Sequence, residues 1–122
     1  MGRPKEPDLS RRLFEFCRSL PGATEDVKWG NDLVFSVGDK MFACFGLPAG
    51  HPFSFKVDPG AFEVLTQQPG IRGAPYLAKH HWVSIETLEA LPTEVIEDLL
   101  DESHSSVASK LPKKRRVQLG IS

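Results

Sequence analysis

The sequence predicts an α+β domain with a mainly antiparallel sheet and helices packed on one face, in the order α-β-β-β-β-α-β-α. Three observations support this prediction. Apolar residues recur at helical spacing near both ends of the chain, strand-like alternation fills the stretch between them, and a Gly-Asp pair of the hairpin type joins two strand candidates. Three amphipathic helices need a shared apolar surface, so we expect them to cover one face and leave the other to solvent or a ligand.

The first helix is predicted to follow a flexible arm, residues 1–7, which contains two prolines. Asp8 is the expected N-cap, and Pro21-Gly22 ends the helix. Its apolar stripe follows the spacing i, i+4, i+7, i+8 and i+11, and consists of Leu9, Leu13, Phe16, Cys17 and Leu20.

A block of strands follows this helix. A short strand is predicted over 25–29, and alternation predicts two further strands over 33–37 and 40–44, joined by the two-residue turn Gly38-Asp39. Residues that face each other across a hairpin lie on the same side of the sheet. A tight turn therefore pairs Leu33 with Cys44, Phe35 with Phe42, and Val37 with Lys40.

The second half of the chain starts with a loop over 46–52 and a strand over 53–57. Asp58-Pro59 then predicts the start of a short helix, because Asp caps the first turn and Pro tolerates the first helical position. We expect that helix to stop at Pro69-Gly70.

An irregular crossover over 71–79 and a last strand over 81–85 precede the final helix, which is predicted over 92–110. The start of this helix is acidic and its end is basic, which complements the helix dipole. We expect residues 112–122 to form a frayed basic tail, so that the domain itself spans 8–111.

Composition limits the classes of function. The chain has 122 residues, enough for one domain, and a net charge of −1, so a nucleic-acid site would have to be a local patch. Cys17 and Cys44 lie among apolar residues and are interpreted as buried free thiols, with a disulfide between them as the alternative. No apolar run is long enough to span a membrane, so we expect a cytoplasmic protein, monomeric or weakly dimeric.

Several short motifs occur in an order that resembles the MmcQ/YjbR family of small bacterial proteins. They are Leu20-Pro21-Gly22-Ala23, Trp29, the run from Gly38 to Ala43, Ala74-Pro75-Tyr76-Leu77, Trp82-Val83, and Leu99-Leu100 followed by Ser103. The resemblance covers roughly residues 9–111 and implies a fold similar to that of CyaY, the bacterial frataxin. It also implies DNA binding of a "double-wing" type, in which β-hairpins contact the duplex.

Cations interspersed with aromatic residues predict a nucleic-acid surface, because cations neutralise phosphates and flat rings stack on bases. We therefore predict a non-catalytic protein that binds DNA without a cofactor. The alternative is that these lysines are ordinary surface residues and that the aromatic residues belong to the core. Residues 113–116 form the densest basic run, which is interpreted as a solvated tail, with phosphate contacts or a nuclear address as alternatives. The predicted contacts are Lys28, Trp29, Lys40, Lys56, Arg72, Tyr76 and Lys79.

An acidic stripe on the last helix supports a rival hypothesis, in which the protein binds a metal cation or a basic protein partner. The alternative is that the stripe is simply a solvent-exposed face of the helix without a ligand. No catalytic motif, metal-ligand spacing or phosphate-binding glycine loop is present in the sequence, and a small-molecule pocket on the uncovered sheet face is a third alternative. The stripe consists of Glu94, Glu97, Asp98, Asp101 and Glu102.

Overall fold

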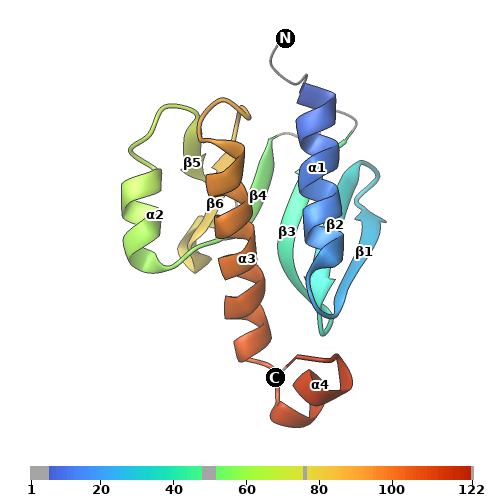
Figure 1. Cartoon of the computed structure of the whole chain (residues 1–122). Coiled ribbons are helices and arrows are strands. Elements are labelled where there is room, and N and C mark those ends of the chain that lie inside the picture. Colours follow the sequence, from blue (N-terminus) through green and yellow to red (C-terminus); the bar gives the residue numbers. More distant parts are fainter. Residues whose placement is uncertain (1–5, 48–51, 76, 122) are drawn as a thin grey trace.

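The computed structural model describes residues 6–47, 52–75 and 77–121, and for residues 6–8 the backbone alone. Its strands form one antiparallel six-stranded sheet in the order β1-β2-β3-β4-β6-β5 (Figure 1). The predicted α+β class with a mainly antiparallel sheet is therefore confirmed. The strands are β1 (Ala23–Lys28), β2 (Asp32–Val37), β3 (Lys40–Gly46), β4 (Phe53–Lys56), β5 (Ile71–Gly73) and β6 (Trp82–Ile85).

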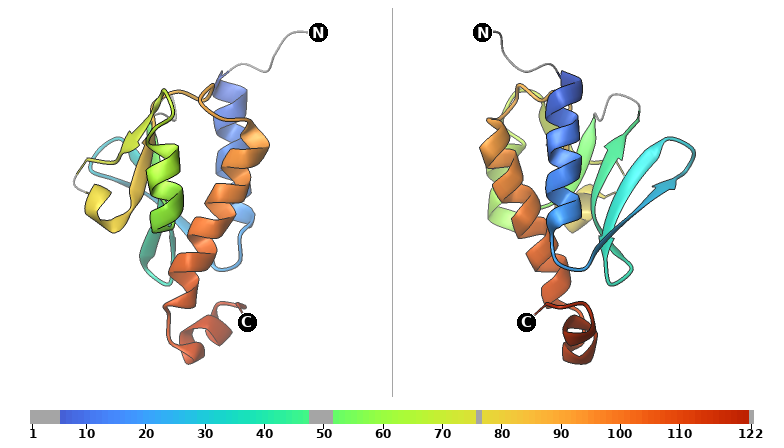
Figure 2. Two further views of the ribbon diagram at one scale, coloured as in Figure 1. Left: turned by 90° about the vertical axis from the view of Figure 1, so that its left-hand side faces the viewer. Right: turned by 45° about the vertical axis from the view of Figure 1, so that its right-hand side comes forward.

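Helices α1 (Glu6–Ser19), α2 (Pro59–Leu65) and α3 (Thr93–Ser109) lie on the same face of this sheet, as predicted (Figures 1 and 2). Phe14 of α1 packs edge-on against Phe45 of β3, with ring centroids 5.0 Å apart. None of the helices in the described ranges combines the length and the apolar character needed to cross a membrane. The five largest fully buried side chains of the core are Phe35, Phe42, Phe45, Phe53 and Phe55.

The two predicted caps differ in their outcome. The Asp58 carboxylate accepts a hydrogen bond from the Ala61 amide at 2.9 Å, and Pro59 is the first residue of α2, as predicted. The prediction that Asp8 caps α1 is wrong, because the helix begins at Glu6 and Asp8 lies within its first turn. Residues 1–5 of the predicted arm are outside the described residues.

The hairpin between β2 and β3 has the predicted two-residue turn. Gly38 and Asp39 both have positive φ, 57° and 67°, as a type I′ turn requires, and Val37 pairs with Lys40. The rest of the predicted register is wrong, because a β-bulge inserts Phe42 into β3 as an extra residue. Beyond the bulge the pairs are Phe35 with Ala43 and Leu33 with Phe45, in place of Phe42 and Cys44.

The face opposite the helices is not the open surface that the sequence predicts. Val34 is 1% exposed and Trp82 6%, and Ser36 and Ser84 are also buried, although the pairing places all four on that face. The Trp82 amide donates to the Leu77 carbonyl at 3.3 Å, where the chain returns to β6. Other positions on this face are half-buried or exposed, namely Cys44, Ser54, Lys56 and Arg72, so the face is covered only in part.

The predicted irregular crossover contains a strand and a short helix. Ile71–Gly73 forms β5, which pairs with β6 at the sheet edge, and Ala78–His80 forms the 3-10 helix η1. His81 has a left-handed backbone with φ 64°, so β6 begins one residue later than predicted. A three-residue strand that ends in glycine is too short to show an alternating pattern, which is why the sequence did not reveal it.

The basic segment after Pro112 is folded, so the prediction of a frayed tail is wrong. Residues Lys113–Gln118 form helix α4, which lies directly beyond the end of α3 (Figure 1). Leu119 and Ile121 then pack against the hydrophobic core. This docking buries apolar side chains that follow the basic run, and it gives the cations of α4 a defined place.

Both cysteines are free thiols, which removes the disulfide alternative; Cys17 is buried as predicted, whereas Cys44 is only half-buried. Burial raises the pKa of Cys17 to about 12 and that of Cys44 to about 11. Because the thiolate is the reactive species, both residues are neutral side chains of the fold at physiological pH.

Candidate anion-binding site

Strands β3 and β4 separate at one end of the sheet. Their ladder runs from the pair Phe45–Phe53 to the pair Ala43–Phe55 and stops there. At the position of the next rung, Ser103 of α3 inserts its hydroxyl group, which donates to the Phe42 carbonyl at 2.7 Å and accepts from the Lys56 amide at 3.1 Å. One buried side chain thus replaces a backbone contact and leaves a gap beyond it.

This gap opens into a cavity of about 350 Å³ between the hairpin tip, Lys56, and the C-terminal end of α3. Most of its wall is apolar, and the end of α3 is held at the hairpin by Leu111, which packs directly over Gly38. We call this cavity the lysine pocket. It is lined by Asp39, Lys40, Met41, Lys56, Leu77, Trp82, Val107, Lys110 and Leu111.

Three lysines give the pocket its charge. Lys56 and Lys110 both line the cavity, and hydrogen bonding to the Lys110 side chain is the main cause of a lowered pKa of Lys56, with burial and the positive charge of Lys110 acting in the same direction. Within the described part of the chain, no carboxylate pairs with Lys40, Lys56 or Lys110. The pocket therefore presents three positive charges and the one carboxylate of Asp39 above apolar walls.

The acidic group in the pocket wall, Asp39, is already engaged. Its carboxylate lies 3.5 Å from the Arg115 guanidinium of α4, which brings the C-terminal basic segment next to the hairpin tip. Lys113 and Lys114, both exposed, follow Lys110 by only a few residues. We refer to Lys40, Lys56, Lys110, Lys113 and Lys114 together as the basic end.

The residues predicted to bind nucleic acid do not form one patch. Lys40 and Lys56 meet at the lysine pocket, whereas Lys28 and Trp29 lie at the β1–β2 turn, at the opposite end of the strands. Trp29 is 70% exposed. Arg72 and Lys79 are also separate from the pocket lining.

Arg72, on the edge strand β5, forms an ion pair with Glu86. Lys79 is exposed on η1, and Tyr76 is outside the described residues. Lys40 and Lys56 are therefore neighbours at the pocket, the other described residues of the set lie elsewhere, and nucleic-acid binding by any of them stays a prediction.

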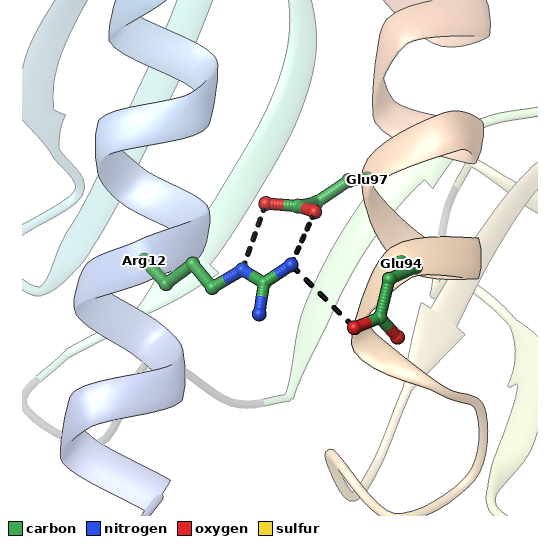
Figure 3. A network of polar contacts seen from close by, with 3 residues as sticks. All are labelled: Arg12, Glu94 and Glu97. Carbon is green, nitrogen blue, oxygen red and sulfur yellow. Dashed lines mark hydrogen bonds and ion pairs between the residues drawn. The ribbon is translucent and has the colours of Figure 1, made fainter. Parts of the chain in front are cut away.

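The acidic stripe on α3 is partly neutralised by Arg12 of α1 (Figure 3). Arg12 donates to both carboxylate oxygens of Glu97, at 2.8 and 3.1 Å, and lies 3.7 Å from Glu94. The described residues contain no group of three or more His, Cys, Asp or Glu placed to hold a metal ion, so the metal-binding form of the rival hypothesis has no site there. Asp98, Asp101 and Glu102 are exposed, and a basic protein partner for them stays a prediction.

The family model described as YjbR matches residues 18–106, well over half of the chain. The chain belongs to the YjbR family. The uncharacterised protein YbdF of Escherichia coli O157:H7 is 33% identical over 92 residues, which cover 71% of this chain and 75% of YbdF.

Two solved structures share the YjbR-family fold seen here. The protein DR2400 of Deinococcus radiodurans, described as containing domain DUF419, superposes with a TM-score of 0.80 at 30% identity, covering 92% of this chain and 88% of DR2400. A protein from Pseudomonas syringae gives a TM-score of 0.63 at 21% identity, covering 88% and 99% of the two chains, which shows the fold alone. The predicted resemblance to the MmcQ/YjbR family is confirmed.

The lysine pocket extends past the part of the chain that the YjbR model matches. That match ends at residue 106, whereas Val107, Lys110 and Leu111 close one side of the cavity. Sequence reasoning missed Lys110 because it assigned this residue to a helix end that complements the dipole. Val107 and Leu111 are spaced four residues apart, as on the buried side of any amphipathic helix, so their pattern does not distinguish a pocket wall from the core.

Proposed function

We propose that this YjbR-family protein is a non-catalytic DNA-binding protein that contacts phosphates with its basic end. The observation that supports this proposal is the convergence of cations from three separate parts of the chain. Lys40 comes from the hairpin, Lys56 from β4, and Lys110 from the end of α3, next to the exposed lysines of α4. Convergent lysines neutralise neighbouring phosphates, and this electrostatic contribution dominates non-specific affinity.

The distribution of charge over the surface also favours the basic end as the side that faces DNA. The whole chain carries a net charge of −1, and the exposed carboxylates of α3, Asp98, Asp101 and Glu102, all precede its last seven residues, 103–109. A polyanion would be repelled by that acidic surface and attracted by the basic end. The affinity for DNA therefore depends more on the positive charge gathered at the basic end than on the net charge of the whole chain.

The test is fluorescence anisotropy of a labelled DNA duplex across a series of salt concentrations. If each of the five lysines of the basic end neutralises one phosphate, log K should fall with log salt at a slope of about −4.5. Replacing Lys113 and Lys114 together by Met should reduce that slope to about −2.7 and weaken binding most at low salt.

The matched control replaces Lys28 and Arg11 by Met, which removes the same charge from exposed residues outside the basic end. This variant should bind with the parental slope. The proposal is wrong if the duplex does not bind at low salt, or if the control and the test variant lose affinity equally.

A further inference from the structure

The walls of the lysine pocket have a chemistry that phosphate contacts alone do not use. Met41, Leu77, Trp82 and Val107 surround the cavity beneath its charged rim. The bases of duplex DNA are stacked inside the helix, so a duplex that lies on the basic end contacts the rim with its phosphates and leaves this apolar cavity unfilled. A ligand that fills it must carry an apolar group.

The lysines at the rim have the complementary requirement for negative charge. Lys56 and Lys110 line the same cavity, and an anion bound between them would relieve the repulsion between their positive charges, which contributes to the lowered pKa of Lys56. Asp39 does not supply this charge, because its carboxylate faces Arg115. Lys40 adds a third cation from the hairpin side of the same cavity.

We infer that the lysine pocket binds a small organic anion in which a flat apolar group is joined to a phosphate or a carboxylate. The flat group lies against Trp82 and Met41, and the anionic group is held by Lys56, Lys110 and Lys40. A cavity of about 350 Å³ with mainly apolar walls and a few convergent polar groups is typical of small-molecule sites in proteins. This inference goes beyond DNA binding and does not depend on it, although both ligands would use the same three lysines.

The chain offers a direct optical readout. It has two tryptophans, and Trp29 is exposed at the β1–β2 turn, at the opposite end of the strands. The variant Trp29→Phe therefore leaves Trp82, in the pocket wall, as the single reporter. Phenyl phosphate is the first probe, with inorganic phosphate and phenol as probes that carry only the anionic or only the apolar part.

We expect phenyl phosphate to change Trp82 fluorescence in a saturable way, and to bind more tightly than either inorganic phosphate or phenol. Lys56→Met and Lys110→Met should each weaken this binding on the order of tenfold, the effect of one lost charge-assisted hydrogen bond. Lys28→Met is the matched control and should bind like the parent. Thermal melting of each variant checks that the fold is retained.

Two further probes distinguish the sources of the anion. Benzoate represents free carboxylates, and deoxyadenosine monophosphate represents nucleotides; tight binding of either one supports the inference and identifies the preferred head group. No saturable binding of phenyl phosphate, benzoate or the nucleotide at millimolar concentration would overturn it, as would binding that is unchanged in Lys56→Met and Lys110→Met. Phenyl phosphate binding without duplex binding would remove the proposed function and leave this inference standing.

Discussion

The backbone amide of Lys56 donates a hydrogen bond to the hydroxyl group of Ser103, which is 1% exposed. The same hydroxyl group donates to the carbonyl of Phe42, so a side chain from α3 joins β3 to β4 at the point where their ladder ends. The position of Lys56 at the pocket thus depends on a contact with Ser103, which lies 47 residues further along the chain.

Replacing Ser103 by Ala should destabilise the fold by about 1–3 kcal/mol, because it leaves a buried donor and a buried acceptor without a partner. Urea denaturation of the parent and the variant measures this difference. Ser105→Ala, on an exposed position of the same helix, is the control and should change stability by less than about 0.5 kcal/mol. Equal stability of Ser103→Ala and the parent would show that the strands close this gap without the hydroxyl group.

Gly38→Ala should destabilise the protein by more than about 1 kcal/mol and disturb the lysine pocket, since Gly38 has a φ of 57°. A Cβ atom there would also lie 2.6 Å from a methyl carbon of Leu111, which lines the pocket. Gly30→Ala provides the matched comparison, because Gly30 has a φ of 88° and no heavy atom within 4 Å of the added Cβ.

Backbone strain is common to both glycine variants, so a larger loss in Gly38→Ala measures the cost of displacing Leu111. Denaturation curves of the two variants give this comparison. If Gly30→Ala is destabilised as much as Gly38→Ala, the contact with Leu111 contributes nothing.

The ion pair between α1 and β1 should make a small, pH-dependent contribution to stability. Arg18 donates to Glu25 at 2.6 and 3.0 Å, and this hydrogen bonding holds the pKa of Glu25 below its ordinary value. The contribution is fully present above the unfolded pKa, about 4.3, and is lost as the pH falls through the lower folded pKa.

Arg18→Met should therefore lower stability near neutral pH by about a few tenths of a kcal/mol, since both side chains are partly exposed, and the difference should vanish in acid. Denaturation at both pH values measures it, with Arg11→Met as a control on the same helix. A difference that persists at low pH would point to lost packing of the arginine stem.

Lys110→Met should raise the pKa of Lys56 toward its ordinary value, because hydrogen bonding to the Lys110 side chain is the largest cause of the shift. A side-chain NMR titration of Lys56 measures this pKa. The destabilisation is fully present at pH values below the lowered folded pKa of Lys56, and it is lost as the pH rises to the unfolded pKa of this residue, about 10.4. Lys28→Met should leave the titration of Lys56 unchanged, and an equal effect of the two variants would contradict the contact.

The elements that sequence predicted best are those specified by local chemistry. Gly38-Asp39 marked the hairpin because both residues adopt positive φ, and Asp58-Pro59 marked the start of α2 because the cap and the proline act within one turn. The bulge at Phe42 was missed because residues 42–45 are all apolar, so their pattern accommodates two registers equally well.

The site was harder to predict than the fold because it depends on contacts between distant residues. Lys40 and Lys56 were recognised as cations on strands, but nothing local shows that Lys110 meets Lys56. The convergence depends on the separation of β3 from β4 and on the docking of Leu111 at the hairpin tip, and both are consequences of tertiary packing.

The hydroxyl bridge of Ser103 also has a consequence for biosynthesis. The strands β1 to β4 leave the ribosome before α3 does, so the carbonyl of Phe42 and the amide of Lys56 must wait for a partner that is translated later. A nascent chain that ends before Ser103 should therefore carry a loosely joined sheet that is open to water and to chaperones at this end. Completion of the domain is then expected only after the last long helix has emerged from the exit tunnel.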